Sequence, residues 1–138
     1  MGRIFALDIG DVWTGTALSD SLGLIARPYK TVKTAQLEVF LKQVLTEESI
    51  EAIVVGYPRT LRGTISEQTK KVLQIKEQLE QKFTTVPWVL WDERLTSKRA
   101  EALKKKKFTK EAKYDSHSLA ATFILDSYLE YRYIHFSK

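Results

Sequence analysis

The stretch that decides the fold is residues 3–20, RIFALDIGDVWTGTALSD. An apolar run covers residues 3–10, and a second run with strand character covers residues 15–20. A third run, LIARPYKTV, follows at residues 24–32. Short apolar or alternating runs separated by Gly, Asp and Ser predict strands joined by tight turns. The chain is therefore expected to open with an antiparallel meander of three strands.

The first of these strands ends on a carboxylate, Asp8. Desolvating a carboxylate is costly unless another group pairs with it. A shared proton, a helix cap or a metal ion could each satisfy Asp8, and the rest of the sequence has to distinguish them.

Helix and strand patterns alternate after the meander. Thr34 is expected to cap a helix whose apolar positions are Leu37, Phe40, Leu41, Val44 and Leu45. That helix leads to the continuous apolar strand AIVVGYP, residues 52–58. The pattern Thr64-x-x-Glu67 predicts a capping box, followed by a helix with one apolar face made of Val72, Ile75, Leu79 and Phe83.

The last part of the chain predicts one more strand and two helices. VPWVLW, residues 86–91, is expected to be a buried strand that stops at Asp92 and Glu93. Thr96 opens a basic helix, and residues 118–134 predict the final helix, with Leu119, Phe123, Leu129 and Tyr133 among its apolar positions. Crossover helices between strands favour parallel pairing, whereas a meander is antiparallel. The predicted fold class is α/β, with a mixed sheet of about five strands in a single domain over residues 1–138.

The composition excludes several kinds of chemistry. The 138 residues are 43% hydrophobic and 28% charged, as in soluble globular proteins. No stretch approaches the about 18 apolar residues of a membrane span, and MGRIFALDIG lacks the features of a signal peptide, so a cytoplasmic protein without membrane contact is expected. Cysteine is absent, which leaves oxygen atoms and two imidazoles as metal ligands. His117 is expected to be partly buried or to support a ligand, and His135 to lie on a frayed terminus.

The positive charge is concentrated in one segment. The net charge is +5, and residues 98–113, KRAEALKKKKFTKEAK, hold eight Lys and Arg against two Glu. Such a patch is typical of nucleic-acid binding, although a solubilising helix face with a lysine-rich loop would look the same. The residues expected to contact nucleic acid are Arg94, Thr96, Lys98, Arg99, Lys104, Lys105, Lys106, Lys107 and Lys113.

Acidic residues stand at three element ends: Asp8, the neighbours Asp92 and Glu93, and Asp115. In open α/β sheets, ligands gather beyond the carboxyl ends of the strands, so these groups could converge there. Converging carboxylates repel one another unless cations lie between them, and Mg²⁺ takes carboxylate, water and phosphate oxygens as ligands. This combination suits metal-assisted hydrolysis of a phosphodiester.

Each acidic residue also has a simpler interpretation. Asp115 could be the N-cap of the last helix. Asp92 or Glu93 could pair with Arg94, and Asp8 could accept hydrogen bonds from the amides of the turn that follows it. The order of the motifs, rather than any single position, favours the functional interpretation.

The motifs occur in a specific order: LDIG, GTALSD and GLIARP, then IVVGYPRTLRGTISEQ, then WDERLTS, and finally YDSHSLAATFILDSYL. This order, over about residues 3 to 131, closely resembles the YqgF family, also called RuvX, of bacterial proteins with a ribonuclease H-like fold. The resemblance implies a mixed five-stranded sheet with helices on both faces.

The same resemblance implies a nuclease that uses Mg²⁺ or Mn²⁺. Its catalytic and metal-binding triad maps onto Asp8, Glu93 and Asp115, with Asp92 as a competing member. The rim of the implied active site comprises Gly10, Gly56, Pro58, Gly63, Gln68, Arg94 and Thr96. The implied role is 5′-end processing of precursor 16S ribosomal RNA, and the alternative is resolution of Holliday junctions in branched DNA.

This chain departs from the family pattern at two places. Val12 and Trp13 replace a basic pair in the turn after the first glycine, and Lys113 and Tyr114 precede the final aspartate where relatives often have a basic residue and valine. These departures concern substrate handling and not the metal ligands. Trp13 and Tyr57 could stack on unpaired bases, or either could be part of the core.

Two other functions are less compatible with the sequence. The D-x-G hairpin also resembles the phosphate-binding hairpin of actin-like ATPases and sugar kinases, which need two such domains around the nucleotide. A non-catalytic RNA-binding module would leave the three carboxylates unexplained. The expected partners are precursor ribosomal RNA and, as the alternative, branched DNA, and the protein is expected to be a monomer or a weak homodimer.

Overall fold

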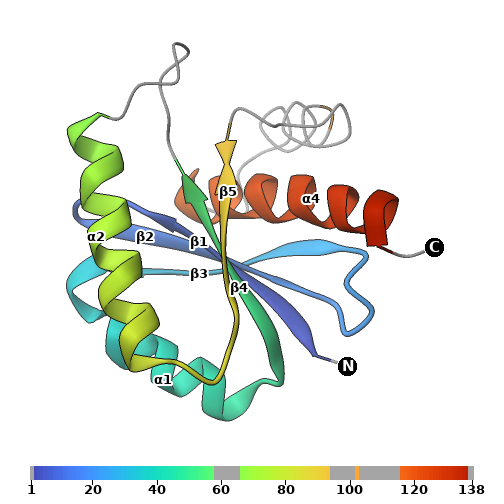
Figure 1. Cartoon of the computed structure of the whole chain (residues 1–138), viewed down its shortest axis with the longest axis horizontal. Helices are drawn as coiled ribbons and strands as arrows, with labels where there is room; N and C mark the ends of the chain where they lie inside the picture. Colours follow the sequence, from blue (N-terminus) through green and yellow to red (C-terminus); the bar gives the residue numbers. More distant parts are fainter. Residues whose placement is uncertain (1, 58–65, 94–101, 103–115, 137–138) are drawn as a thin grey trace.

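A computed structural model describes residues 2–57, 66–93, 102 and 116–136 of the chain. Three strands come first: β1 (Arg3–Ile9), β2 (Trp13–Ser19) and β3 (Ala26–Lys33). The elements after them are the 3-10 helix η1 (Thr34–Gln36), α1 (Leu37–Glu47), β4 (Ile50–Tyr57), α2 (Glu67–Lys82), β5 (Trp88–Asp92) and α4 (Ser116–Phe136) (Figure 1).

The strands form one mixed sheet in the order β3-β2-β1-β4-β5. β1 pairs antiparallel with β2, and β2 pairs antiparallel with β3, so the predicted meander is confirmed. β4 joins β1 in parallel, and β5 joins β4 in parallel. Because the parallel strands run in one direction, the carboxyl ends of β1, β4 and β5 lie at the same edge of the sheet (Figure 1).

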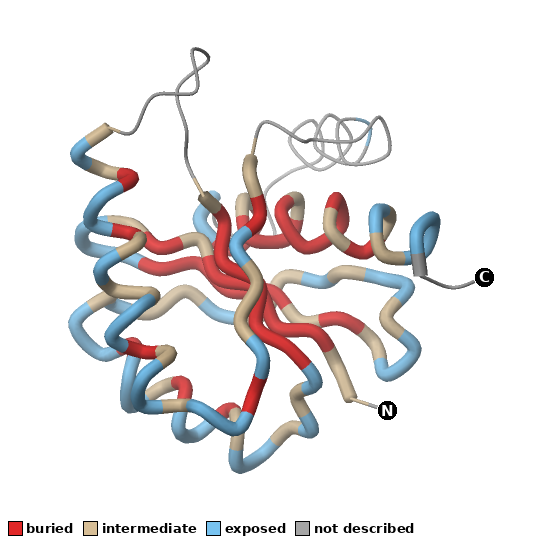
Figure 2. Tube along the Cα trace, viewed as in Figure 1, coloured by how far each residue is buried: buried red, intermediate tan, exposed pale blue. Residues whose placement is uncertain are grey.

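Helices cover both faces of this sheet, as predicted. On one face, Phe5 and Leu7 of β1 pack in a buried cluster with residues of α1 and α2. On the other face, Ile4 and Ala6 pack with residues of α4. Figure 2 shows the buried residues along the central strands and on the side of α4 that meets the sheet. Side chains alternate between faces along a strand, so Asp8 belongs to the face covered by α4.

The helix starts differ from two expectations. Thr34 does not cap α1: it begins η1, and its hydroxyl donates a hydrogen bond to the carbonyl oxygen of Gly10 at 2.7 Å. The cap of α2 is Ser66 rather than Thr64, since the Ser66 Oγ accepts a hydrogen bond from the amide of Thr69 at 3.1 Å. At α1 the N-cap position is Gln36, whose side chain makes no capping hydrogen bond, so of these two helices only α2 has a hydroxyl cap of the predicted kind. Within the described ranges, no helix combines the length and the apolar character needed to cross a bilayer.

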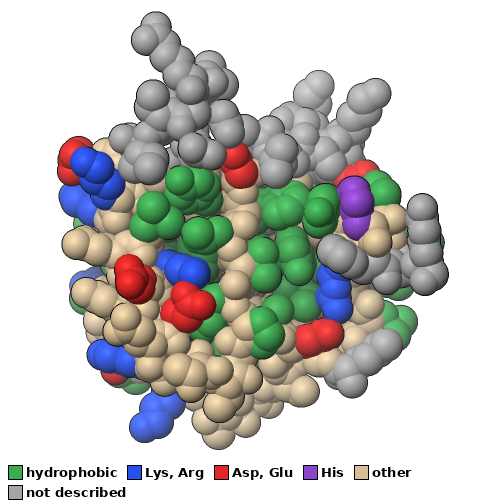
Figure 3. Space-filling view, viewed as in Figure 1, with side chains coloured by type: hydrophobic (Ala, Val, Ile, Leu, Met, Phe, Trp, Pro, Cys, Tyr) green, Lys and Arg blue, Asp and Glu red, His purple; other side chains and the backbone are tan. Residues whose placement is uncertain are grey.

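The prediction that residues 86–91 form a buried strand is only partly right. β5 is the last strand of the sheet, and within it only Trp91 is buried. Leu90 remains 41% exposed, because an edge strand has a neighbour on one side only. Figure 3 shows hydrophobic side chains gathered on the side of the molecule where β5 forms this edge.

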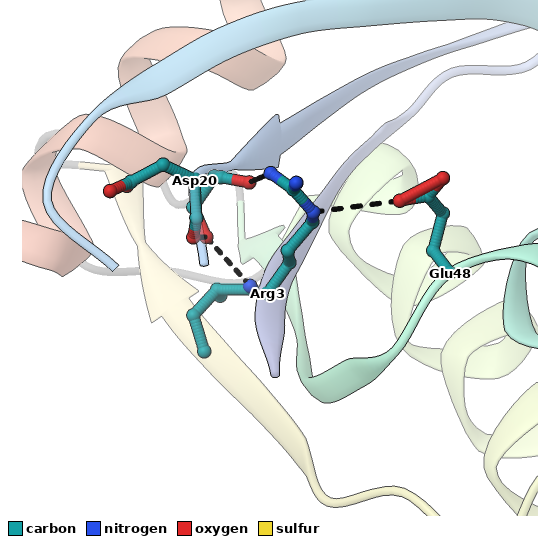
Figure 4. A network of polar contacts seen from close by, with 5 residues as sticks. Arg3, Asp20 and Glu48 are labelled. Carbon is teal, nitrogen blue, oxygen red and sulfur yellow. Dashed lines mark hydrogen bonds and ion pairs between the residues drawn. The ribbon is translucent and has the colours of Figure 1, made fainter. Parts of the chain in front are cut away.

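A polar network holds the opposite end of β1. The Arg3 guanidinium donates to the carbonyl oxygen of Ser19 at 2.9 Å and lies 3.5 Å from the Glu48 carboxylate (Figure 4). The Asp20 carboxylate accepts hydrogen bonds from the amides of Leu24 and Ile25, at 2.7 and 2.8 Å, and so closes the turn between β2 and β3. These contacts fix the strand ends that are remote from the acidic edge.

Candidate active site

Asp8 lies one residue before the end of β1, with its side chain half-buried on the face covered by α4. Burial raises the pKa of its carboxyl above the ordinary value of 3.8, and the nearby His117 acts in the opposite direction. The strand continues to Ile9, and Asp8 and Ile9 pair with Gly15 and Thr14 of β2 in the sheet. The carboxylate is therefore held at a fixed place on the sheet.

Glu93 brings a second carboxylate to the same face. Trp91 packs on the α4 side of the sheet, so Asp92, the last residue of β5, belongs to the opposite side. Glu93 follows the end of the strand, and its carboxyl carbon lies 3.5 Å from the position of a Cβ on Gly56, the residue of β4 beside Asp8. Burial raises the pKa of Glu93 from 4.5 to about 7, with further contributions from the negative charges of Asp8 and Asp92. The repulsion by Asp8 indicates that the two carboxylates lie close together.

Gly56 provides the space for the second carboxylate. The β1–β4 register pairs Leu7 with Val55, so Asp8 and Gly56 are the next residues along these two strands. A Cβ at Gly56 would collide with the end of the Ile124 side chain and would lie 3.5 Å from the carboxyl carbon of Glu93. A glycine here lets Ile124 and Glu93 both approach the backbone of β4.

Gly15 brings the beginning of α4 to the site. It is the cross-strand partner of Asp8, and a Cβ at this position would collide with the carbonyl oxygen of His117. The first turn of α4 therefore lies directly on the backbone of β2. His117 is exposed rather than partly buried as expected, and its electrostatic effect lowers the pKa of the Asp8 carboxyl.

The turn between β1 and β2 is held by several hydrogen bonds. The Gly10 amide donates to the carbonyl oxygen of Trp13 at 3.0 Å, and the Thr34 amide donates to that of Val12 at 2.8 Å. The hydroxyl groups of Thr14 and Thr34 are 2.8 Å apart. A Cβ at Gly10 would come within 2.6 Å of the Trp13 carbonyl oxygen, so this tight turn requires glycine.

A polar groove adjoins the site on the α2 side. Its volume is about 420 Å³, and it lies between the end of β1 and the first turns of α2. Gln68, which the resemblance places at the rim, lines it together with Gly10, Asp11 and Lys71. Lys71 forms an ion pair with Asp11 at 3.5 Å.

The structure thus brings together four of the residues that the sequence singled out: Asp8, Gly10, Gly56 and Glu93. Asp92 is close enough to raise the pKa of Glu93, although strand alternation puts it on the other face. The predicted residues that lie outside the described part of the chain are Asp115, Pro58, Gly63, Arg94, Thr96, Lys98, Arg99, Lys104, Lys105, Lys106, Lys107 and Lys113. Among the described residues alone, no three acidic or histidine side chains form a metal-binding group.

Sequence reasoning missed two features of the site. Gly15 fits the pattern of a strand, but a glycine inside a strand often also marks a close approach of another backbone. The ion pair of Asp11 and Lys71 joins residues 60 positions apart, and no local pattern predicts it. Both features depend on how α2 and α4 pack against the ends of the strands.

The chemistry of the site follows from its two carboxylates. Asp8 and Glu93 are partly desolvated, and the negative charge of Asp8 raises the cost of ionising Glu93. A divalent cation would offset this repulsion, and hard cations such as Mg²⁺ prefer carboxylate oxygens. The donor set therefore fits a divalent metal ion better than a neutral ligand.

Solved structures with the same fold include two of RuvC from T. thermophilus. The T. thermophilus RuvC in complex with Holliday junction substrate matches with a TM-score of 0.73 and 17% identity, over 99% of this chain and 98% of that chain. A second T. thermophilus RuvC structure matches with a TM-score of 0.64 and 16% identity, over 98% and 96% of the two chains. At this identity the likeness concerns the fold, and it confirms the expected ribonuclease H-like architecture.

Sequence comparison identifies much closer relatives. A protein of Rubrobacter xylanophilus is 39% identical over 129 residues, which cover 94% of this chain and 93% of that protein. A protein of Thermoanaerobacter pseudethanolicus is 38% identical over 134 residues, with 93% and 96% covered. Both carry the name "Putative pre-16S rRNA nuclease". The family model described as "RuvX: Holliday junction resolvase" matches residues 2–131, and the chain belongs to this RuvX family.

Proposed function

We propose that this protein is a metal-dependent nuclease that hydrolyses phosphodiester bonds at the 5′ end of precursor 16S ribosomal RNA. The observation that carries the proposal is the pair of carboxylates, Asp8 and Glu93, which share one face at the carboxyl edge of the sheet. Membership of the RuvX family and the names of the close relatives support a nuclease.

Asp8, Glu93 and Asp115 are the proposed ligands of a divalent ion, Mg²⁺ or Mn²⁺. Asp115 is two positions before His117, whose charge acts on Asp8. This proximity in sequence supports Asp115 as the third carboxylate. When bound, such an ion polarises the phosphate and lowers the pKa of bound water. The protein's own contribution is to hold the carboxylates on a rigid strand end and under the first turn of a helix.

The basic segment, residues 98–113, is the proposed contact for the phosphate backbone. A site made of carboxylates repels its own polyanionic substrate, so positive charge nearby is needed to hold the nucleic acid. Arg94 and Thr96, which closely follow Glu93, belong to the same proposed surface. Contacts of this kind are independent of sequence and weaken as the salt concentration rises.

The alternative substrate is a four-way DNA junction. The family description favours this alternative, as does the junction bound in the T. thermophilus RuvC complex. A junction resolvase must make two symmetric cuts, which requires a dimer with two sites in a fixed arrangement. The names of the close relatives favour RNA.

The decisive experiment compares cleavage of a pre-16S 5′ leader fragment with cleavage of a mobile four-way junction at equal ionic strength. We expect leader cleavage that requires Mg²⁺ or Mn²⁺ and that is lost in Asp8→Asn. Depletion in cells should cause unprocessed 16S rRNA 5′ ends to accumulate. Symmetric nicking of the junction with intact leader RNA would establish the alternative instead.

A pair of substitutions tests the choice between the neighbouring acidic residues. Asp92 belongs to the face of the sheet away from Asp8, whereas Glu93 lies near Gly56 and Asp8, and this supports Glu93 as the metal ligand. Glu93→Gln should abolish cleavage, whereas Asp92→Asn should retain it. An active Glu93→Gln beside an inactive Asp92→Asn would reverse the assignment.

A further inference from the structure

An exposed tryptophan stands next to the acidic site. Trp13, the first residue of β2, is 42% exposed. The other two tryptophans are held inside the fold: the Trp88 indole donates a hydrogen bond to the carbonyl oxygen of Phe83 at 3.0 Å, and Trp91 is 8% exposed. Trp13 thus presents a large aromatic surface to solvent beside the acidic site, where a ligand from outside the chain can cover it.

The position of Trp13 relative to Asp8 follows from the strand register. Asp8 pairs directly with Gly15, and Trp13 is two residues from Gly15 toward the turn. Trp13 is therefore the diagonal cross-strand neighbour of Asp8 on the same face, at about 7 to 8 Å between backbones, which is within reach of an aromatic side chain. The first turn of α4 packs over Gly15, so Trp13 flanks the acidic site on the other side of this turn.

The backbone that carries Trp13 is fixed before any ligand arrives. Its carbonyl oxygen accepts the hydrogen bond from Gly10, and Thr34 binds the adjoining turn through both its amide and its hydroxyl. A rigid aromatic residue costs little conformational entropy on binding. This favours a preformed platform over a surface that must be ordered by its partner.

A cation stands beside the ring. Lys33, at the end of β3, is the direct cross-strand partner of Trp13, and its ammonium lies 6.0 Å from the centre of the ring. This distance is at the limit of a cation–π contact, so the ammonium can leave the ring at small cost. An aromatic face with a neighbouring cation matches the two parts of a nucleotide, the base and the phosphate.

We infer that Trp13 and Lys33 form a subsite for one unpaired nucleotide of a single-stranded RNA, with the base stacked on the indole and the phosphate beside the ammonium. This subsite lies next to the carboxylates and rests on the proposed nuclease function for its biological role. It replaces the basic pair expected in this turn by an aromatic residue and a cation from the neighbouring strand. The chain thereby selects substrates whose bases are already free.

Tyr57, the other aromatic residue considered for stacking, does not share this position. Ile53 and Val55 of β4 pack on the side of α1 and α2, so alternation assigns Tyr57 to that side as well. It is half-buried and pairs with Asp92 in the β4–β5 register. Trp13 alone of the two is both exposed and on the face of Asp8.

The test is tryptophan fluorescence and binding affinity, measured in the presence of a chelator so that no cleavage occurs. The probe is a short single-stranded oligoadenylate, with an RNA duplex of equal length for comparison. Trp13 is the most exposed of the three tryptophans, so stacking should quench the emission of the wild-type protein and leave that of Trp13→Phe largely unchanged. The duplex should cause little quenching, because its bases are already stacked on one another.

The variants separate stacking from charge. Trp13→Ala should weaken binding of the single strand by about 5- to 150-fold, as expected for the loss of one stacked base, whereas Trp13→Phe should retain most of the affinity. Lys33→Gln should reduce the slope of log K against log salt by about 0.7, the value for one phosphate contact on a single strand. Val12→Ala is the matched control, since Val12 is 61% exposed in the same turn.

Three results would overturn the subsite. These are wild-type affinity in Trp13→Ala, equal quenching by the duplex, or no binding of the oligonucleotide by the wild-type protein. The nuclease proposal fails by a different readout. If the single strand quenches Trp13 but no metal ion supports cleavage, the subsite stands and the proposed catalytic function does not.

Discussion

Replacing Glu93 by glutamine should stabilise the metal-free protein at neutral and alkaline pH. The pKa of Glu93 is raised from 4.5 to about 7 by burial and by the charges of Asp8 and Asp92. In the unfolded chain this carboxyl ionises at its ordinary pKa, so between pH 4.5 and 7 the folded state binds a proton that the unfolded state has lost. Below pH 4.5 Glu93 is protonated in both states and costs the folded protein nothing. The free energy of unfolding therefore falls as the pH rises from 4.5 to 7, and above pH 7 the folded protein carries the full cost of ionising Glu93.

The magnitude follows from the size of the shift. One pKa unit corresponds to about 1.4 kcal/mol, so the shift of Glu93 sets an upper limit of about 3 kcal/mol. Glu93 is half-buried, and solvent screening reduces this to about 1 to 2 kcal/mol. In a chain of this length, that corresponds to an increase of roughly 3 to 8 °C in Tm for Glu93→Gln at about pH 8.

The assay is thermal and urea unfolding of wild type and Glu93→Gln with a chelator present, at about pH 4.5, 6 and 8. The difference in free energy of unfolding between the two proteins should be near zero at the lowest pH and largest at the highest. Glu77→Gln, which removes an exposed charge from α2, should change stability by less than about 0.5 kcal/mol at every pH. Millimolar Mg²⁺ should stabilise the wild type more than the variant. A difference that does not depend on pH, or a variant less stable than wild type at the highest pH, would refute the electrostatic account of this site.

The other predictions concern the metal site, the approach of α4, the cap of α2 and the basic segment. Asp8→Asn should abolish cleavage, keep the circular dichroism spectrum of the wild type and raise Tm in chelator, and near wild-type cleavage in Mg²⁺ or Mn²⁺ would exclude Asp8 as a metal ligand. Gly15→Ala should destabilise the protein by about 1 to 3 kcal/mol in urea unfolding and also reduce cleavage, because the added methyl collides with the backbone of α4. Ser66→Ala should cost about 1 kcal/mol in the same assay, and an unchanged stability would mean that the Ser66 hydroxyl is not the cap. Neutral residues at positions 104–107 should weaken RNA binding and flatten its salt dependence, whereas an unchanged slope would assign these lysines to solubility.

Local patterns were sufficient for most elements of the fold. The alternation of residues 3–20 predicted the antiparallel hairpin, and the spacing of Leu37, Leu41 and Val44 predicted the buried face of α1. Caps and edges were less predictable. Thr34 and Thr64 fit cap patterns, but Ser66 caps α2 and Thr34 binds the turn at Gly10. The choice among several nearby hydroxyl groups depends on backbone geometry that no single residue encodes.

By itself the sequence determined the order of strands and helices, the carboxylates at their ends and the family to which the chain belongs, because each of these is carried by residue type and spacing along the chain. The tertiary structure decided which side chains share a face. It brought Glu93 near Asp8, laid the first turn of α4 on Gly15, and left Trp13 exposed with the Lys33 ammonium 6.0 Å from the centre of its ring. These relations join residues that are distant in sequence, and they arise from strand register and from the packing of helices on the sheet, which depend on all the strands and helices at once.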